Sequence, residues 1–338
     1  MKSTYKKGLI GLLLLFLVVS CAAATGYLRF VNFCATPADT GASQILFTVS
    51  PGQNLKTIAR RLELASIISD SRYFTWLVRI KKADKKLQAG QYLLSAAYSP
   101  EKILQNLISG KVQLYKITFP EGLTIAETAF KIQDAGFCSG DRFSELCRDQ
   151  IFARSLGVNA ASLEGYLFPD TYFFPKPTDC EIIIQAMLNR FNQVMKPAWK
   201  ARSTEMGLTV YDVITLASII EKETGDASER PVISSVFHNR LKKRMRLESD
   251  PTVIYGIKNF DGNITRKHLR TKTPYNTYRI KGLPAGPIAN PGALSIEAAL
   301  YPAQTDYLFF VSKKDTTHYF SKTIQEHNRA VRKYQLRK

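Results

Sequence analysis

A single carboxylate, Glu221, ends an unusually apolar segment of the sequence. Thr209 and Asp212 have the spacing of a capping box, which predicts a helix that begins near Val210. Residues 213–220 are apolar almost all the way round such a helix, as is typical of a core helix. Burial and the negative end of the helix dipole both disfavour a charged carboxylate there. We therefore predict that Glu221 is protonated near neutral pH, as a general acid requires.

Two other interpretations of this segment stay open. Glu221 could form an ion pair with Lys222 or Arg230, which follow it closely in the sequence. Glu223 competes for the catalytic role, because helical geometry alone does not separate two carboxylates of one turn. Of the two, Glu221 is the catalytic residue that we predict.

Four loop segments combine unusual residues with little regular structure. They are Leu163–Pro175, Arg246–Gly256, Pro274–Tyr278 and Gly282–Gly292. Loops of this length in a compact domain are usually functional. They carry Tyr, Asn, Thr and Asp, which hydrogen-bond to sugars and stack on them. The alternative is that the tyrosines fill a core and that the Pro/Gly-rich loop is a rigid turn.

Together with Leu216–Thr224, these loops resemble the endolytic murein transglycosylase family, in the same order over residues 112–331. The resemblance implies a bacterial, membrane-anchored lyase without a cofactor that cuts peptidoglycan glycan strands internally. It implies that Glu221, the first Glu of the Glu-Lys-Glu-Thr motif, is the catalytic acid. It also implies a peptidoglycan synthase as a neighbour in the membrane, with cleavage terminating nascent strands.

The expected reaction breaks the bond between N-acetylmuramic acid and N-acetylglucosamine. Glu221 first protonates the leaving oxygen and then accepts the proton of the muramic acid 6-hydroxyl, which leaves a 1,6-anhydro end. Intramolecular attack gains a large effective molarity and needs no second carboxylate. We expect the substrate-binding residues to lie within the matching motifs. They are Glu223, Glu248, Asp250, Tyr255, Asn276, Thr277, Tyr278 and Asn290.

Position 248 departs from the family pattern, in which glutamine is usual. If Glu248 lines the cleft, its charge would favour protonation of Glu221, or it could activate water. The alternative is a surface glutamate paired with Arg244 or Arg246.

Three other functions follow from these alternatives. A hydrolytic muramidase would use Glu221 with Glu248 or Asp250. A non-catalytic protein would bind cell-wall glycan without cutting it. A nucleic-acid binder is suggested by the net charge of +19 alone.

The N-terminal segment argues against nucleic acid. Lys2, Lys6 and Lys7 precede an uncharged apolar run from Gly8 to Leu28, long enough to span a bilayer. The lysines predict a cytoplasmic N-terminus and an exported body, anchored in the cytoplasmic membrane. A cleaved signal peptide is one alternative, and a lipid on Cys21 is another. Each of the three exports residues 30–338, so we expect an anionic partner such as peptidoglycan.

Charge and cysteine content add little to this. The densest basic stretches, Lys81–Lys86 and Lys242–Arg244, could each be a solvated helix face. The four histidines are scattered, so no metal site is predicted. Among the five cysteines, Cys138 and Cys147 are close enough in sequence to pair in an exported protein.

The predicted fold class is α+β, in a chain of 338 residues with 45% hydrophobic residues. Its predicted parts are a tail (1–7), a transmembrane helix (8–28), a linker (29–43), a LysM-like module (44–111) and a catalytic domain (112–338). The module should contain strands at 44–49 and 90–94 and helices at 55–62, 73–80 and 99–107. The catalytic domain should contain a strand at 112–119, helices at 124–133, 141–148, 181–195, 210–223 and 229–243, and a hairpin at 307–311 and 318–321. Residues 245–305 should be mostly loop with short helices.

Overall fold

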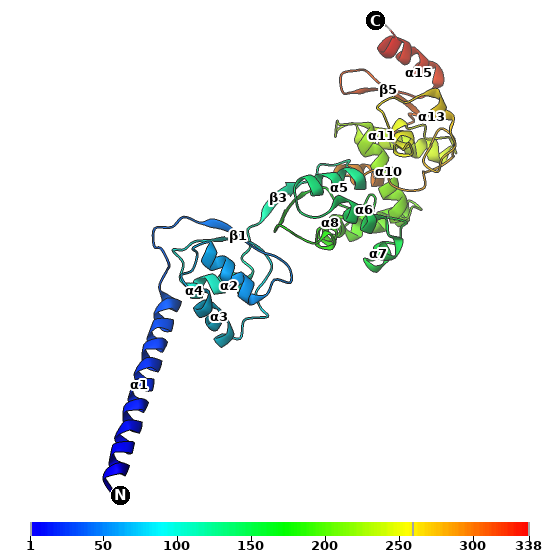
Figure 1. Cartoon of the computed structure of the whole chain (residues 1–338). Helices are drawn as coiled ribbons and strands as arrows, with labels where there is room; N and C mark the ends of the chain where they lie inside the picture. Colours follow the sequence, from blue (N-terminus) through cyan, green and yellow to red (C-terminus); the bar gives the residue numbers. More distant parts are fainter. Residues whose placement is uncertain (1, 259, 337–338) are drawn as a thin grey trace. The chain divides into compact units, whose positions relative to one another are not determined.

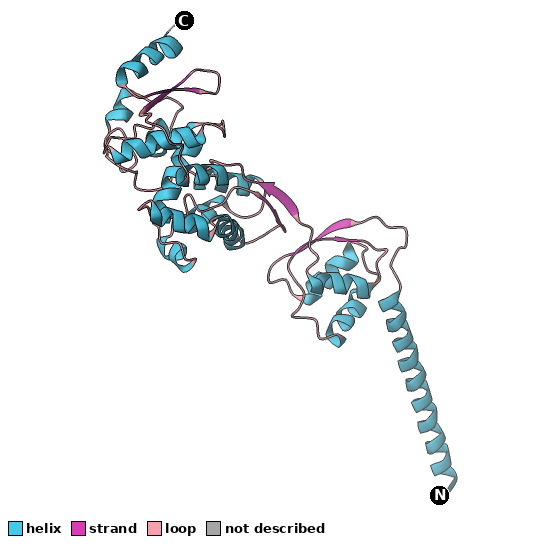
Figure 2. Cartoon of the chain, turned by 180° about the vertical axis from the view of Figure 1, so that it is seen from behind, coloured by secondary structure: helices cyan, strands magenta, loops and turns pink. Residues whose placement is uncertain are grey.

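The structure, a computed structural model, describes residues 2–258 and 260–336, with side chains from Leu13 onward. The chain divides into two compact units. Unit 1 comprises Met1–Tyr115 with Pro175–Pro177, and unit 2 comprises Lys116–Phe174 with Thr178–Lys338. Helices predominate in both, with short strands between them (Figure 2). The predicted mixed α and β class is therefore confirmed, and the glycan-binding character of the first module stays a prediction.

A long helix, α1 (Lys2–Ala35), opens unit 1 (Figure 1). Its segment Leu13–Ala35 has 23 residues and a mean hydropathy of 1.9, which is long and apolar enough to cross a membrane. Helix α1 extends beyond the predicted end at Leu28, so the first part of the predicted linker is helical. The reason is packing, because Phe33 of α1 is buried in the core of unit 1.

The rest of unit 1 follows the predicted order strand, helix, helix, strand, helix. Its elements are β1 (Ile45–Val49), α2 (Leu55–Leu64), α3 (Ser71–Ile80), β2 (Gly90–Leu94) and α4 (Pro100–Ser109). The side chains of Asn54, Asp70 and Ser99 cap α2, α3 and α4, as their residue types favour. Strands β1 and β2 pair antiparallel, and alternate residues such as Phe47 and Val49 enter the core.

Unit 2 begins with β3 (Tyr115–Thr118), which straddles the boundary and pairs with β4 (Thr171–Phe174). Its first helices are α5 (Ile125–Asp134), α6 (Gly140–Arg148), α7 (Gln150–Ser155), α8 (Cys180–Val194) and α9 (Pro197–Glu205). The central and later helices are α10 (Val210–Glu223), α11 (Arg230–Lys242), α12 (Asp250–Tyr255), α13 (Arg266–Arg270) and α14 (Ala293–Leu300). The unit closes with the antiparallel hairpin of β5 (Phe309–Ser312) and β6 (His318–Ser321), then α15 (Ile324–Val331) and the π-helical turn η1 (Arg332–Leu336).

Five elements of unit 2 were not predicted, namely α7, α9, β4, α15 and η1. Helices α7 and α9 are short, and α9 buries little of its surface, so their sequences carry a weak helical periodicity. Strand β4 lies inside the segment Leu163–Pro175 that we interpreted as a loop. Its four residues are flanked by Pro169, Asp170 and Pro175, and these turn-forming residues obscure the strand pattern.

The predicted pairing of Cys138 with Cys147 is wrong. Cys138 forms a disulfide with Cys180, 42 residues away in the sequence. Cys147 is a free, buried thiol on the inner face of α6, one helical turn after the buried Phe143. Cys147 points from α6 into the protein core, so it cannot reach Cys138 in the loop before α6.

Candidate active site

Helix α10 carries both candidate carboxylates of the sequence. The predicted capping box is present, since Thr209 Oγ1 accepts from the Asp212 N–H while Asp212 accepts from the Thr209 N–H. The eight residues 213–220 are all buried, and α10 packs against α14 and α11. The last turn of α10 lies outside this core and carries Glu221 and Glu223. Their side chains point about 200° apart around the helix axis, because successive residues are about 100° apart.

The side chain of Glu221 is held inside the protein and is only 6% exposed. Its Oε1 accepts from Arg230 Nη2 at 3.0 Å, and its Oε2 accepts from the Gly292 N–H at 3.0 Å. The nearby Lys222 Nζ donates instead to the Gly122 carbonyl at 3.2 Å. The alternative of an ion pair with Arg230 is therefore present. Glu221 is thus both buried and hydrogen-bonded to a cation and to a backbone N–H group.

A second carboxylate, Glu121, shares the same guanidinium. Arg230 Nη2 lies 3.3 Å from Glu121 Oε2, so one cation serves two acids. Burial and the negative charge of Glu221 raise the pKa of Glu121, and Arg230 acts in the opposite direction. A Cβ at Gly292 would overlap the Glu121 carboxyl group, so a larger residue there would push this flexible side chain away from Arg230. Sequence reasoning missed Glu121, because Pro120–Gly122 was interpreted only as a turn.

Glu223 has a different environment, because it lines a cleft of about 360 Å³. The Ser249 hydroxyl donates to its Oε1 at 2.5 Å. Burial raises the pKa of Glu223 to about 7 with help from the charge of Asp250, against the lowering effect of the Ser249 hydrogen bond. Glu223 is therefore a carboxyl group at a cleft that is divided between its acid and base forms near neutral pH.

Three predicted substrate-binding residues line the same cleft, namely Glu248, Asp250 and Tyr278. The Tyr278 hydroxyl donates to Asp250 Oδ1 at 2.8 Å. The aromatic and apolar part of the lining comes from Leu247, Phe309, Phe310 and Ile324, with His327 and Arg240 beside them. The structure thus brings acidic, aromatic and hydroxyl groups together around Glu223.

The predicted partners of Glu248 are wrong. Glu248 pairs with Arg240 Nη1 at 3.3 Å, and not with Arg244 or Arg246. Arg240 Nη1 also donates to the carbonyls of Arg246 and Leu247, so it fixes the chain that leads to Glu248. Because Arg240 is buried on α11, sequence proximity gave no sign of this contact.

Asn276 and Thr277 are fully buried and hold loops together. Asn276 Nδ2 donates to the carbonyls of His268, Leu269 and Thr271, at 3.1, 3.2 and 2.6 Å. Thr277 Oγ1 accepts from the Ser249 N–H at 3.0 Å. The structure therefore places these two residues behind the cleft, where they position Ser249 and Tyr278.

Tyr255 and Asn290 join a second buried acid, Glu164. The Tyr255 hydroxyl donates to Glu164 Oε2 at 2.9 Å, and Glu164 Oε1 accepts from the Ile125 N–H at 3.0 Å. Burial raises the pKa of Glu164 to about 7. Asn290 Oδ1 accepts from the N–H groups of Gly165 and Leu167. This network ties the loops that flank Glu121 and Gly292. Glu164 was missed as a site residue, although its aromatic motif was recognised.

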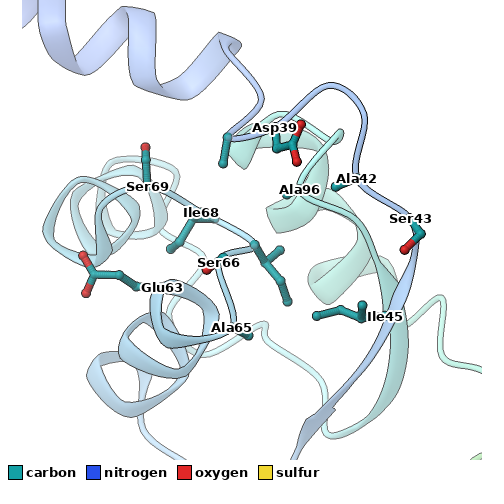
Figure 3. Close-up of a pocket in the computed structure, with 12 residues that line it drawn as sticks. Asp39, Ala42, Ser43, Ile45, Glu63, Ala65, Ser66, Ile68, Ser69 and Ala96 are labelled. Atoms are coloured by element: carbon teal, nitrogen blue, oxygen red, sulfur yellow. The ribbon is translucent and has the colours of Figure 1, made fainter.

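Unit 1 contains a hollow of about 540 Å³, shown in Figure 3. Two carboxylates line it, and both serve the fold. Asp39 Oδ1 accepts from the Gly41 N–H at 2.9 Å, and Glu63 accepts from the Ser71 N–H and hydroxyl at 3.2 and 2.7 Å. This hollow therefore offers small polar and apolar groups, and its two carboxylates are held by hydrogen bonds within the fold.

Comparison with known proteins gives consistent matches. The YceG-like family pattern covers residues 47–333. An endolytic murein transglycosylase of Bacillus subtilis is 36% identical over 302 residues, which cover 85% of this chain and 83% of that protein. One from Streptococcus pneumoniae serotype 2 is 28% identical over 97% of this chain and 65% of its own length. A crystal structure of a YceG-like protein from Listeria monocytogenes has a TM-score of 0.59 and 34% identity, covering 85% of this chain and 98% of its own.

Proposed function

The chain belongs to the YceG-like family, and we propose that it is an endolytic murein transglycosylase that leaves 1,6-anhydro-muramic acid ends. The observation that carries the mechanism is that Glu223 lines a cleft of about 360 Å³ together with Asp250 and Tyr278. Burial, which raises the pKa of Glu223 to about 7, supports it. The names of the curated relatives support the substrate and the reaction class.

One carboxyl group suffices for this reaction. Glu223 in its acid form protonates the glycosidic oxygen as the bond to C1 of muramic acid breaks. The 6-hydroxyl oxygen of the same sugar then bonds to C1, and its proton passes to the Glu223 carboxylate. The acid is regenerated and no water is consumed. A group with a pKa near the working pH serves both steps, since it is a competent donor and then a competent acceptor.

The neighbours of Glu223 support these two roles. The Ser249 hydroxyl fixes one carboxyl oxygen, which leaves the other to face the cleft. The Asp250 carboxylate, oriented by Tyr278, adds negative charge on the side where an oxocarbenium-like transition state is stabilised. We assign Tyr278 to sugar contact, and Asn276 and Thr277 to holding this wall in place.

Glu221 was the first choice from the sequence, and its contacts favour a positioning role. Both of its oxygens accept hydrogen bonds from the protein, one from the buried Arg230 and one from the Gly292 backbone. We propose that Glu221 and Arg230 fix the last turn of α10 against the loop before α14. Tyr255 and Asn290 both donate hydrogen bonds to Glu164, and we propose that they stabilise the same loop indirectly.

We also propose that α1 anchors the protein in the cytoplasmic membrane, with the N-terminus inside and both units outside. Its apolar segment and the lysines that precede it support this orientation. Peptidoglycan strands are then within reach of unit 2, and a peptidoglycan synthase in the same membrane is the proposed partner. Cleavage there would terminate nascent strands.

A hydrolytic muramidase is the second candidate, because Glu248 and Asp250 stand at the same cleft as Glu223. Hydrolysis needs a carboxylate that is free to hold water, and the charge of Glu248 is already paired with Arg240. This pairing argues against Glu248 as that carboxylate and leaves Asp250 as the group that a muramidase would use.

The two candidates differ in their product ends. The full-length protein in detergent is incubated with purified peptidoglycan, and the fragments are analysed by mass spectrometry. We expect internal fragments with 1,6-anhydro ends, which are lighter by one water than hydrolysed ends. Reducing ends that carry the added water would support the muramidase, and intact glycan would support a binding protein.

A further inference from the structure

Helix α3 of unit 1 presents an apolar and basic surface that the reaction does not use. We define the α3 surface as Trp76, Arg79, Ile80, Lys82, Lys85 and Lys86, which are all exposed. Trp76 is 54% exposed and Ile80 is 64% exposed, and their i, i+4 spacing puts them on one face of the helix. Leu77 and Val78 lie in the core on the opposite face, so Trp76 and Ile80 are not needed to hold α3 in place.

A chain of aromatic rings connects this surface to the end of α1. Tyr73 of α3 packs against Phe33 with ring centroids 5.5 Å apart, and against Phe30 at 6.2 Å. Trp76 follows, with its centroid 5.8 Å from that of Tyr73. Figure 1 shows α3 in the same unit as the upper end of α1, and the two helices are in contact. The α3 surface is therefore continuous with the last turns of α1.

The length of α1 indicates how far from the centre of the bilayer the contact between α1 and α3 lies. This estimate rests on the proposed membrane anchor. Arg29 is the first charged residue after the apolar run from Gly8 to Leu28, and a charge favours the edge of the hydrocarbon layer. If this run fills that layer, Phe30 and Phe33 lie about 3 and 7.5 Å beyond it, at 1.5 Å per residue. The headgroup region on each side of a bilayer is about 5–7 Å thick. Tyr73 and Trp76 are therefore at headgroup level, where the rings of Trp and Tyr are favoured.

The positive charge of the α3 surface complements the anionic headgroups of a membrane. Lys81 is already paired with Glu101 at 2.7 Å, whereas Arg79, Lys82, Lys85 and Lys86 are exposed cations beside the exposed Asp84. Four cations with one acid, next to a membrane-spanning helix, are a pattern that binds anionic headgroups. Lysine and arginine stems also pack along apolar surface while their charges stay in water.

We propose that the α3 surface binds the anionic headgroup layer of the membrane beside the end of α1. Unit 1 then rests on the bilayer through α3 and does not swing freely on α1. Trp76 and Ile80 enter the interface, and Arg79 and Lys82 contact lipid phosphates.

The two tryptophans of the chain, Trp76 and Trp199, allow a direct test. The full-length protein is reconstituted in vesicles of phosphatidylglycerol and phosphatidylcholine that contain a lipid brominated close to the headgroup. Trp199→Phe leaves Trp76 as the sole fluorophore, and Trp76→Phe is the matched control that leaves Trp199 in unit 2. We expect the brominated lipid to quench most of the Trp76 signal, and the Trp76→Phe protein shows how much quenching comes from Trp199.

Flotation of the same vesicles separates this inference from the anchor. If the protein does not float with the lipid, the proposed anchor fails and this inference fails with it. If it floats while aqueous iodide quenches Trp76 and the brominated lipid does not, the α3 surface is in water and this inference alone is overturned. In the Trp199→Phe background, Arg79→Glu with Lys82→Glu should move Trp76 from lipid quenching towards iodide quenching. Unchanged quenching would overturn the assigned role of charge.

Discussion

At the scale of residues, Glu221 and Glu223 differ in the groups that reach them from distant parts of the chain. Arg230 and Gly292 occupy the oxygens of Glu221, whereas Ser249 holds one oxygen of Glu223 at the cleft. The capping box and the apolar run predicted the helix end, and therefore both candidates. Their order of preference could not be predicted, because the residues that distinguish them lie 9 to 71 positions away in the sequence.

The pKa of Glu223 predicts the pH dependence of the reaction. The first step needs the acid form, so kcat/KM should fall as the pH rises through about 7. The Ser249 hydrogen bond lowers this pKa, and Ser249→Ala should therefore move the falling limb to higher pH. Glycan cleavage rates measured from pH 5 to 9 check this, with the exposed Ser69→Ala in unit 1 as the control. If kcat/KM of Ser249→Ala falls at the same pH as that of the natural protein, Glu223 is not the group that controls this pH dependence.

Gly292 predicts a steric effect at the other side of α10. A Cβ there would overlap the Glu121 carboxyl group, the half-exposed end of a flexible side chain, so Gly292→Ala should push it away from Arg230. The expected cost is about 1 kcal/mol of unfolding free energy, the low end of the range for overpacked sites. The substitution should also lower activity, because the Gly292 N–H holds Glu221. Gly225→Ala is the matched control, since its Cβ meets open space. Thermal unfolding of both variants compares them, and equal stabilities would refute the close approach.

At the scale of elements, the apolar periodicity of the sequence predicted most helices of the chain. Asn54, Asp70, Ser99, Thr124 and Thr209 each cap a helix that was expected from periodicity. The misses have physical causes too. Helix α9 owes its place to tertiary contacts, and β4 exists because β3 pairs with it. Pairing and packing of this kind leave little local pattern.

The disulfide between Cys138 and Cys180 ties the loop before α6 to the start of α8. By chain entropy, closing a loop over 42 residues stabilises the fold by at most about 4 kcal/mol. Replacing both cysteines by serine should therefore lower the melting temperature in non-reducing buffer. A reductant should lower the melting temperature of the natural protein and leave that of the double variant unchanged. If the reductant lowers both equally, the effect does not come from this disulfide.

At the scale of the whole molecule, the sequence predicted a long apolar N-terminal helix, which the structure contains as α1. The end of the anchor was misjudged, because hydropathy reports apolar length and does not report what the apolar residues touch. Phe30 and Phe33 read as the start of a linker, yet they pack on α3. The same residues therefore serve both the helix and the core of unit 1.

This shared role predicts a difference between two truncations. A chain that begins at Arg29 should leave the membrane fraction and keep the stability of unit 1. A chain that begins at Thr36 should also leave the membrane, but it loses the buried Phe33, which should cost about 3 kcal/mol. Fractionation and thermal unfolding of both proteins provide the measurements. Equal stabilities would mean that Phe33 contributes nothing to the core.

The central claim is that Glu223 is the proton donor and that Glu221 positions it. The most direct measurement is the rate of glycan cleavage by full-length Glu223→Gln and Glu221→Gln, with thermal unfolding and glycan binding measured alongside. We predict that Glu223→Gln folds and binds glycan normally but loses about 10²–10⁴-fold in rate. Glu221→Gln should unfold at lower temperature, and its folded fraction should keep the pH limb of the natural enzyme. A folded, inactive Glu221→Gln beside an active Glu223→Gln would contradict the account and make Glu221 the acid.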